Sequence, residues 1–169
     1  AIGYSEASHI PYEMGLIKNK YVGRTFIQPT QELRNQGVRM KLSAVSSIVN
    51  QKRVIMIDDS IVRGTTSKRI VTLLKEAGAT EVHVRIASPA IKYPCFYGVD
   101  TSTLDELISH KMTTQELCAY IGADSLAFIS EEGLQKSIHF KKEHTCDLCM
   151  ACFNKQYVTP LYDNDFQDD

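Results

Sequence analysis

Several features that mark other protein classes are missing from this sequence of 169 residues. It has no apolar run approaching the roughly 18 residues that a membrane-spanning helix needs. Its first residues do not combine a basic segment with an apolar one, as a secretory signal does. Its five cysteines are an odd number, which does not favour the disulfide framework of a secreted domain. We therefore expect a soluble, cytoplasmic chain of about one domain without a membrane partner.

Common ligand-binding motifs are missing as well. Neither a Walker A loop nor the G-x-G-x-x-G pattern is present. No segment qualifies as a helix-turn-helix or a strongly basic recognition helix, so we expect no nucleic-acid partner. The five histidines show no ligand spacing such as H-x-x-x-H, which favours structural or solvated histidines.

The charge of the chain is unevenly distributed. The net charge is -1, yet residues 16–41 hold six basic residues against the single acid Glu32. The six are Lys18, Lys20, Arg24, Arg34, Arg39 and Lys41. Such a local cationic strip suits an anionic ligand smaller than a nucleic acid. A solvated loop with scattered charges is the alternative.

The middle of the sequence predicts a strand–loop–helix–strand unit. Residues 54–57 (VIMI) form a short apolar run, which is typical of a buried parallel strand. Apolar residues then recur at helical spacing from Ile70 to Ala77, with Thr65 or Thr66 expected to cap the start and Gly78 to end the helix. The alternating stretch EVHVRIAS predicts a second strand. This order indicates an α/β fold with a βαβ unit.

Two further helices are predicted from capping signals. Thr113 and Glu116 form a capping-box pattern before a short helix that Gly122 ends. Ser130 is expected to cap a second helix over residues 131–138. The acidic end of the chain, YDNDFQDD, has no periodicity and is expected to be disordered.

The residues between the first strand and its helix carry the clearest chemical signal. A loop at a helix N-terminus directs backbone N–H groups at one spot, which favours a phosphate. Gly64 permits close approach, and the hydroxyls of Ser60, Thr65 and Thr66 add donors. Asp58 and Asp59 could accept hydrogen bonds from sugar hydroxyls or hold magnesium. A phosphate together with a diol indicates a ribose 5-phosphate.

This pattern, four hydrophobic residues followed by D-D-S and R-G-T-T, resembles the phosphoribosyl pyrophosphate motif of type I phosphoribosyltransferases. Three blocks, GYSEASHIPYEMGLIKNKYVGRTFIQPTQELR, VIMIDDSIVRGTTSKRIV and SPAIKYPCFYGVDTSTLDELIS, resemble the carboxyl-terminal part of the glutamine phosphoribosylpyrophosphate amidotransferase family. The resemblance covers residues 1–157, with 158–169 as an acidic tail. It implies a partial Rossmann-like parallel sheet flanked by helices, followed by a helical, cysteine-containing segment.

The resemblance also implies roles for individual residues. The loop over residues 54–66 would bind phosphoribosyl pyrophosphate, with Asp58 and Asp59 on the ribose hydroxyls and magnesium and Ser60 to Thr66 around the 5-phosphate. Arg63 lies at the mouth of this loop, and we expect it to contribute to ligand binding. A surface ion pair is the alternative. Residues 16–41 would form the flexible loop that closes over the substrate. Its implied contributors are Lys18, Tyr21, Arg24, Lys41 and Ile27.

The implied reaction is attack of ammonia from glutamine on C1 of the ribose, which releases pyrophosphate and forms phosphoribosylamine in purine synthesis. The family has an amino-terminal glutaminase part with a terminal cysteine nucleophile, whereas the first cysteine here is Cys95. We therefore expect that this chain does not hydrolyse glutamine. We also expect that it is a fragment or one part of a split enzyme. Purine nucleotides as feedback inhibitors, a partner chain and a homo-oligomer are further implied partners.

The cysteines give a second signal. Cys146, Cys149 and Cys152 form C-x-x-C-x-x-C, which in a reducing compartment indicates zinc or an iron–sulfur cluster, with unpaired thiols as the alternative. The resemblance favours a [4Fe–4S] cluster on Cys95, Cys149 and Cys152, and Cys146 is a candidate fourth ligand. Cys118 is interpreted as a small core residue.

Two other functions fit the same motif. A regulatory module could sense phosphoribosyl pyrophosphate without catalysis. A different type I phosphoribosyltransferase could act on a nucleobase, although the strip K-N-K-Y-V-G-R-T-F-I favours the amidotransferase resemblance. A sheet that lacks an upstream strand would expose an edge, so self-association is expected.

Overall fold

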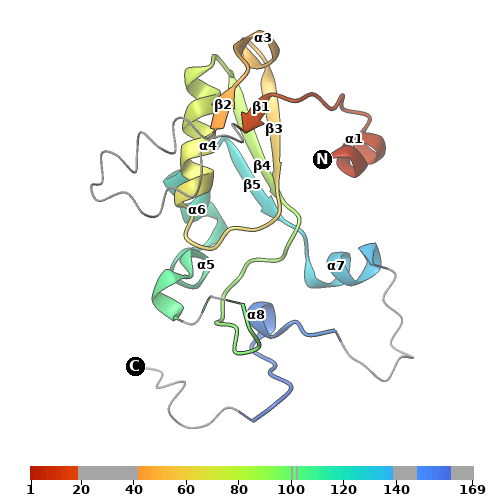
Figure 1. Cartoon of the computed structure of the whole chain (residues 1–169), viewed down its shortest axis with the longest axis vertical. Helices are drawn as coiled ribbons and strands as arrows, with labels where there is room; N and C mark the ends of the chain where they lie inside the picture. Colours follow the sequence, from red (N-terminus) through yellow and green to blue (C-terminus); the bar gives the residue numbers. More distant parts are fainter. Residues whose placement is uncertain (19–41, 100, 102, 139–147, 161–169) are drawn as a thin grey trace. The chain divides into compact units, whose positions relative to one another are not determined.

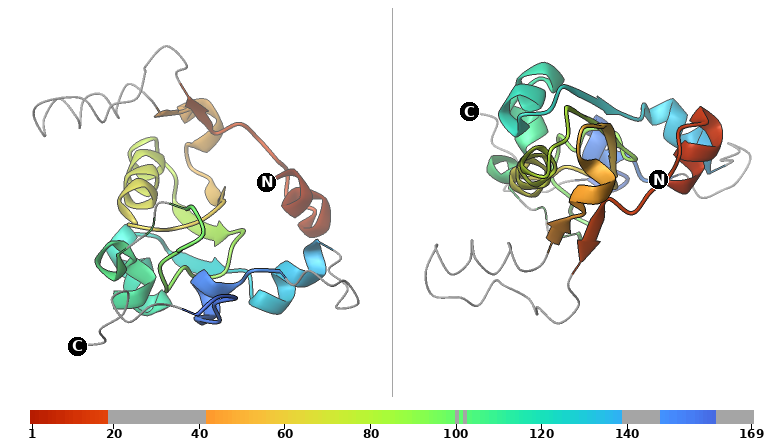
Figure 2. Two further views of the ribbon diagram at one scale, coloured as in Figure 1. Left: turned by 60° about the horizontal axis from the view of Figure 1, so that its bottom comes forward. Right: turned by 90° about the horizontal axis from the view of Figure 1, so that it is seen from above.

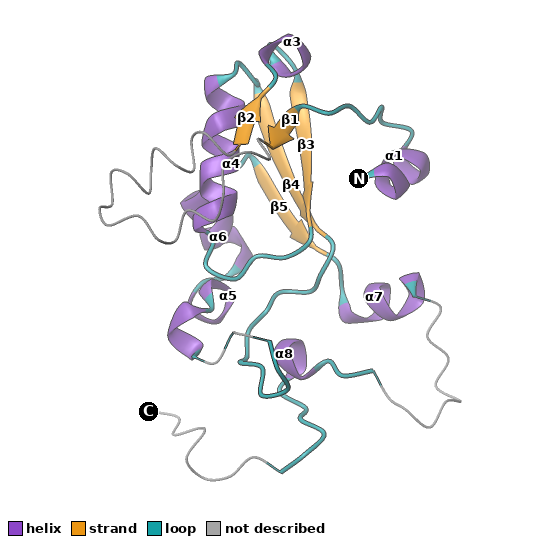
Figure 3. Cartoon of the chain, in the orientation of Figure 1, coloured by secondary structure: helices purple, strands orange, loops and turns teal. Residues whose placement is uncertain are grey.

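The structure is a computed structural model, and it describes residues 1–18, 42–99, 101, 103–138 and 148–160. Helices and strands alternate from residue 42 to residue 86, and three helical elements separate this part from the last strand (Figure 3). The described residues divide into two compact units. Unit 1 consists of Ala1–Ile57, Thr65–Val84 and Cys118–Ser125, and unit 2 of Asp58–Gly64, Arg85–Leu117 and the chain from Leu126 onward.

A three-stranded sheet has the order β3-β4-β5, formed by β3 (Arg53–Asp58), β4 (Glu81–Ile86) and β5 (Ser125–Phe128). The N–H groups of Thr80 and Ala87 donate to the carbonyls of Lys52 and Asp58 at opposite ends of β3. Because both sequence numbers rise together, β3 and β4 are parallel. Asp124 and Ile129 donate to Val82 and Ile86 in the same way, so β5 is parallel to β4. The predicted strands at 54–57 and 81–88 are confirmed.

In unit 1, helix α4 (Thr65–Glu76) runs alongside strands β3 and β4 (Figures 1 and 2). Ile70 and Leu74 of the predicted apolar face are buried, whereas Leu73 and Ala77 are only partly buried. Val71, which lay outside the predicted set, is buried as well. Val82 and Val84 of β4 are fully buried in the same unit. Burying each such side chain contributes about 1.5–3 kcal/mol. The predicted helix is confirmed, but it begins at Thr65, so Thr65 and Thr66 lie in its first turn rather than before it.

Gly78 follows this helix with φ +98°, a backbone conformation that favours glycine. A Cβ atom at this position would collide with the side-chain oxygen of Asn50. The carbonyl of Gly78 accepts a hydrogen bond from the N–H of Gln51 at 2.8 Å. The predicted helix end at Gly78 therefore requires glycine for a second reason, because the backbone of Gly78 lies against Asn50 and Gln51, just before β3.

A row of hydrogen-bonded polar side chains connects the three strands within unit 1. Arg53 of β3 donates to Glu81 of β4 at 2.8 Å, and the same carboxylate oxygen lies 2.8 Å from His83 Nε2. His83 Nδ1 lies 2.8 Å from the hydroxyl of Ser125 on β5. The hydrogen bond from Arg53, followed by the one from His83, lowers the pKa of the Glu81 carboxyl. The structural role expected for this histidine is thus to join β4 to β5.

Unit 1 also contains elements that the sequence did not predict. Helix α1 (Ile2–Ser8) and helix α3 (Ser46–Val49) are short, and strands β1 (Leu16–Lys18) and β2 (Leu42–Ala44) pair antiparallel with Leu16 opposite Ala44. The expected flexible loop at 16–41 therefore starts inside a strand, and the neighbouring strand begins directly after it.

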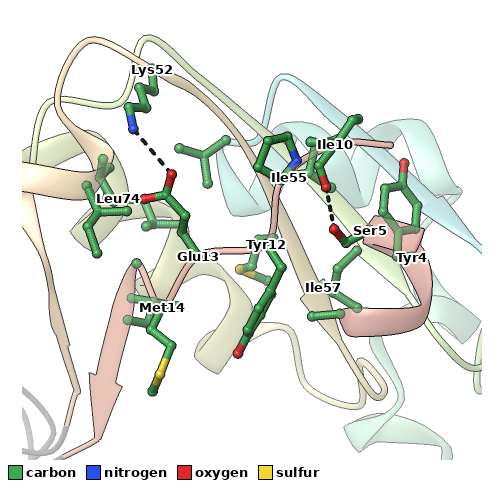
Figure 4. A pocket seen from close by; sticks show the side chains of 18 of the residues that line it. Tyr4, Ser5, Ile10, Tyr12, Glu13, Met14, Lys52, Ile55, Ile57 and Leu74 are labelled. Atoms are coloured by element: carbon green, nitrogen blue, oxygen red, sulfur yellow. Dashed lines mark hydrogen bonds and ion pairs between the residues drawn. The ribbon is translucent and has the colours of Figure 1, made fainter. Parts of the chain in front are cut away.

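A pocket of about 330 Å³ lies in unit 1 between α1, the following extended segment and β3 (Figure 4). Ile55 and Ile57 of β3 contribute apolar walls together with Tyr12. The segment is held by an ion pair of 3.7 Å between Glu13 and Lys52. Tyr12 and Met14 are 50% and 63% exposed, so this side of unit 1 carries uncovered apolar surface.

Unit 2 contains most of the remaining short elements. They are the 3-10 helix η2 (Leu104–Glu106), helix α5 (Ile108–Lys111), the first turn of α6 (Thr114–Ile121), α7 (Glu131–Ser137) and α8 (Ala151–Asn154). The capping box is confirmed, because Thr113 N–H donates to Glu116 at 2.8 Å and Glu116 N–H to the Thr113 hydroxyl at 3.3 Å. The Ser130 cap is confirmed by a 3.0 Å hydrogen bond from Gly133.

Candidate functional site

The loop Asp58–Gly64 of unit 2 starts at the carboxyl end of β3 and leads directly into helix α4. The carboxyl ends of parallel strands are where α/β proteins bind their ligands. The Asp58 carbonyl is held by the N–H of Ala87, which follows β4, at 3.0 Å. The first residue of the loop is therefore fixed at the edge of the sheet.

Asp58 and Asp59 differ in their surroundings although they are adjacent. Asp58 is half-buried and Asp59 is exposed. Burial, with a smaller contribution from the negative charge of Asp59, raises the pKa of the Asp58 carboxyl, and the hydrogen bond from Asp59 N–H opposes this. Asp59 Oδ1 accepts hydrogen bonds from the N–H and the hydroxyl of Ser60. The two carboxylates are thus partly satisfied acceptors that could bind hydroxyl groups or a cation.

The rest of the loop is held by one buried side chain and by two contacts with residues far along the sequence. Ile61 is 1% exposed, so its side chain is buried in the core. The carbonyl of Val62 accepts a hydrogen bond of 2.9 Å from Ile108 N–H at the start of α5. Arg63 donates to the Glu106 carboxylate of η2 at 2.6 Å. Glu106 and Ile108 lie more than forty residues from the loop, and no local pattern in the sequence could have indicated them.

Gly64 has φ +73° and is followed by the first turn of α4, which contains no acidic residue. Thr65 and Thr66 are exposed, whereas Ser67 is 2% exposed and belongs to the core of unit 1. Unpaired N–H groups in the first turn of a helix favour an anion. The loop thus ends at the kind of helix start that suits a phosphate, and the predicted phosphate site stays a prediction.

The residues expected to close over a ligand are mostly outside the described chain. Lys18 is exposed at the end of strand β1 in unit 1. Tyr21, Arg24, Ile27 and Lys41 lie outside the described residues, as does the expected disordered tail beyond residue 160. Their implied roles stay predictions.

Three of the candidate cysteines lie in unit 2. The N–H groups of Lys92 and Tyr93 donate to the Cys152 carbonyl at 2.9 and 3.1 Å, which joins the segment before Cys95 to helix α8. Burial raises the pKa of the Cys152 thiol, and negative charge on Cys95 and Cys149 raises it further. Cys149 is exposed, and Cys146 lies outside the described residues.

An aromatic cluster covers this junction. Tyr157 donates its hydroxyl to the Pro94 carbonyl at 2.8 Å and packs against Phe96 at 5.3 Å between ring centroids. Burial raises the pKa of Tyr157 to about 12, with smaller contributions from charge on Cys152 and Cys95. Tyr157 was not predicted as a site residue, since a single tyrosine near the end of the chain has no local signature.

Metal-ligating side chains do not converge in the described part of the chain. Among these residues, no group of three or more histidine, cysteine, aspartate or glutamate side chains is arranged to hold a metal ion. The thiols of Cys95, Cys149 and Cys152 nevertheless have the donor chemistry of a cluster site and come from two segments held together by backbone hydrogen bonds. In the part of the chain that the structure covers, no helix has the length and apolarity needed to cross a membrane.

The fold and the loop define a class, the α/β chains with a candidate ligand loop between a parallel strand and the following helix. No protein-family model matches the chain. It is 64% identical over 163 residues to the amidophosphoribosyltransferase of Bacillus subtilis (strain 168), covering 96% of this chain and 34% of that protein. The corresponding protein of Synechocystis sp. is 55% identical, with 96% of this chain and 32% of the relative covered.

Solved structures agree. The structure is similar to the glutamine phosphoribosylpyrophosphate amidotransferase of B. subtilis complexed with ADP and GMP, with a TM-score of 0.87, 62% identity, and coverage of 98% of this chain and 37% of that chain. A structure described as the allosteric regulatory enzyme of purine biosynthesis gives a TM-score of 0.84, 60% identity, and coverage of 98% and 36%. The predicted resemblance and the α/β fold class are confirmed. The chain spans about one third of the length of the amidophosphoribosyltransferases that it matches.

Proposed function

We propose that this chain is the phosphoribosyl pyrophosphate-binding portion of an amidophosphoribosyltransferase. In the complete reaction ammonia from glutamine attacks C1 of the ribose. The bond from C1 to the pyrophosphate oxygen breaks, pyrophosphate leaves with the electron pair, and the nitrogen loses a proton to give 5-phosphoribosylamine. The observation that carries the proposal is the D-D-S-I-V-R-G-T-T loop between β3 and α4.

The loop would bind the sugar phosphate through its two ends. Asp58 and Asp59, at the carboxyl end of β3, would accept hydrogen bonds from the ribose hydroxyls. Ser60, Arg63, Gly64 and the first turn of α4 would surround the 5-phosphate. Positioning of C1 and neutralisation of the departing pyrophosphate would supply the catalysis, since the step requires no side-chain nucleophile.

Two further groups would complete substrate binding. Magnesium, held by Asp58 and Asp59 directly or through water, would offset the pyrophosphate charge. Lys18 and the residues Tyr21, Arg24, Ile27 and Lys41 would form the closing segment. Lys18 is suited to this role because it is exposed at the end of β1.

We further propose that Cys95, Cys149 and Cys152 are ligands of a [4Fe–4S] cluster, with Cys146 as the fourth and zinc as the lesser alternative. When bound, the cluster would cross-link the segment around Cys95 to helix α8. The backbone hydrogen bonds to Cys152, together with Tyr157 and Phe96 beside Cys95, support a partly covered site at this junction, with Cys149 on its exposed side.

Ammonia would come from a glutaminase part, either in the remaining two thirds of a complete enzyme or on a partner chain. Purine nucleotides would be feedback inhibitors, and a homo-oligomer in the cytoplasm would be the working form. The similar B. subtilis amidotransferase was solved as a complex with ADP and GMP, which supports the nucleotide proposal.

Calorimetric titration with phosphoribosyl pyrophosphate and magnesium tests the main proposal. We expect saturable binding by the wild-type chain and its loss in Asp58→Asn/Asp59→Asn. Asp105→Asn is the matched control, because Asp105 is an acid of the same unit whose side chain is 93% exposed. An ammonia-dependent transferase assay should follow.

The outcomes separate the alternatives. Binding with no turnover, even with a glutaminase part added, would favour the sensing module. Release of a purine base from a nucleotide incubated with pyrophosphate would favour a nucleobase transferase. Folded wild-type chain that binds no more tightly than the double variant would contradict the proposal.

Anaerobic reconstitution with iron and sulfide tests the cluster. We expect about four irons per chain and a broad absorption band near 400 nm, both reduced in Cys95→Ser and retained in Cys118→Ser. Stoichiometric binding of zinc in place of iron would contradict the cluster proposal. Equal metal content in the two variants would contradict it as well.

A further inference from the structure

A second pocket lies in unit 2, away from the loop Asp58–Gly64 in the sequence. It has a volume of about 590 Å³. It is lined by Ala90, Lys92 and Tyr93, by residues 109–114 from α5 to the start of α6, and by Glu116, Leu117 and Phe128. Small-molecule sites in proteins commonly have volumes of 300–1,000 Å³. Nothing in the proposed function uses this pocket.

The lining carries more positive than negative charge. Lys92 and Lys111 face a single acid, Glu116. The Glu116 carboxylate accepts hydrogen bonds from both the N–H and the hydroxyl of Thr113, so it is engaged in capping α6. Lys111 is paired with Asp105 at 3.0 Å, whereas Lys92 has no ion pair within the described chain. This balance favours an anion.

The pocket also has flat walls. Tyr93 and His110 meet edge to face with ring centroids 6.4 Å apart, and Phe128 adds a third ring. Aromatic side chains favour contact with another ring. The same pocket thus combines ring surfaces with a cationic group.

We propose that this pocket binds a small organic anion that carries a ring. Lys92 and Lys111 hold the charged group, and Phe128 and Tyr93 contact the ring. The pocket shares no lining residue with the loop Asp58–Gly64, although the start of helix α5 is hydrogen-bonded to that loop through Ile108 and Val62.

Titration of phenyl phosphate into isotopically labelled chain, followed residue by residue by NMR, tests the site. We expect saturable shifts of the amides of residues 92–93 and 109–117, with inorganic phosphate at least about fivefold weaker because it has no ring. Benzoate distinguishes a carboxylate from a phosphate as the preferred group, and binding of either supports the site. Lys92→Met should weaken binding about fivefold or more.

Lys136→Met, on helix α7 of the same unit and outside the pocket, is the matched control and should bind like the wild type. Thermal melts establish that each variant folds. Shifts confined to residues 58–66, no saturable shifts at the pocket amides, equal binding of inorganic phosphate, or equal effects of Lys92→Met and Lys136→Met would each overturn the site.

Discussion

The Arg63 guanidinium lies 2.6 Å from the Glu106 carboxylate, and both side chains are about half exposed. This ion pair joins the candidate phosphate loop to the 3-10 helix η2 within unit 2. The pair also engages the cation that the sequence assigned to the mouth of the loop. A phosphate approaching Arg63 would compete with Glu106 for the same donors.

Glu106→Gln should therefore raise the affinity for phosphoribosyl pyrophosphate by a factor of about two to five, since exposed ion pairs contribute about 0.2–1 kcal/mol. Arg63→Ala should lower it by more than that factor. Calorimetric titration of both variants measures the two effects. Equal, small effects of the two substitutions would show that Arg63 is only a surface partner of Glu106.

The affinity for the same ligand should also depend on the ionisation of Asp58. Burial raises the pKa of its carboxyl, so Asp58 gains a proton at a higher pH than an ordinary aspartate, whose pKa is about 3.9. Protonation removes an acceptor, and affinity should fall with its midpoint above that value. Titrations between pH 4 and 7 measure the midpoint. A profile unchanged in Asp58→Asn would contradict the assignment.

A raised carboxyl pKa has the opposite effect on folding. The folded chain binds the proton more tightly than the unfolded chain, so the cost of burying the Asp58 charge is present above the folded pKa and is relieved as pH falls through it. The same acidification thus weakens ligand binding and removes one destabilising contribution. Denaturation curves for wild type and Asp58→Asn should converge as the pH falls.

Gly78→Ala and Gly122→Ala form a matched pair for the stability of unit 1. Both glycines have positive φ, +98° and +73°, but a Cβ at Gly78 meets Asn50 whereas one at Gly122 meets nothing within 4 Å. We expect Gly122→Ala to cost about 1–2 kcal/mol and Gly78→Ala distinctly more. Urea denaturation measures both. Equal costs would mean that Asn50 moves aside freely.

Tyr157 should ionise at a higher pH than an ordinary tyrosine. Its pKa of about 12 lies above the ordinary value of 10, so its contribution to stability is complete below pH 10 and is lost as pH rises toward 12. Absorbance near 295 nm should show a late titration step that is missing in Tyr157→Phe. If that variant keeps the late step, another tyrosine is responsible.

The apolar side of unit 1 around the pocket of Figure 4 should drive self-association. Met14 lines this pocket and is 63% exposed, and Ile17 of strand β1 is 54% exposed. Strand β3 has one neighbour among the described strands of its sheet. Sedimentation equilibrium should show oligomers that Met14→Lys shifts toward monomer. Val158→Lys, at an exposed apolar residue of unit 2, is the control. A monodisperse wild-type monomer would contradict this prediction.

Local sequence patterns correctly predicted the structural elements that depend on residues close together in the sequence. The strand before Asp58, the helix from Thr65 and the capping box at Thr113 each rest on contiguous residues, and each is present. The short strand β5 and the four-residue helices were missed, because they are too short to establish a period. Long-range partners such as Glu106 for Arg63, or Pro94 for Tyr157, have no signature in a single sequence.

The hydrogen bond from Ala87 N–H to the Asp58 carbonyl gives the candidate site a natural reporter. It is a bond at the end of the β3–β4 pair, and its acceptor belongs to the first residue of the loop. Amide protons exchange with solvent only when such bonds open. The deuterium uptake of this one backbone position would therefore register ligand occupancy in real time, without any label or substitution in the loop.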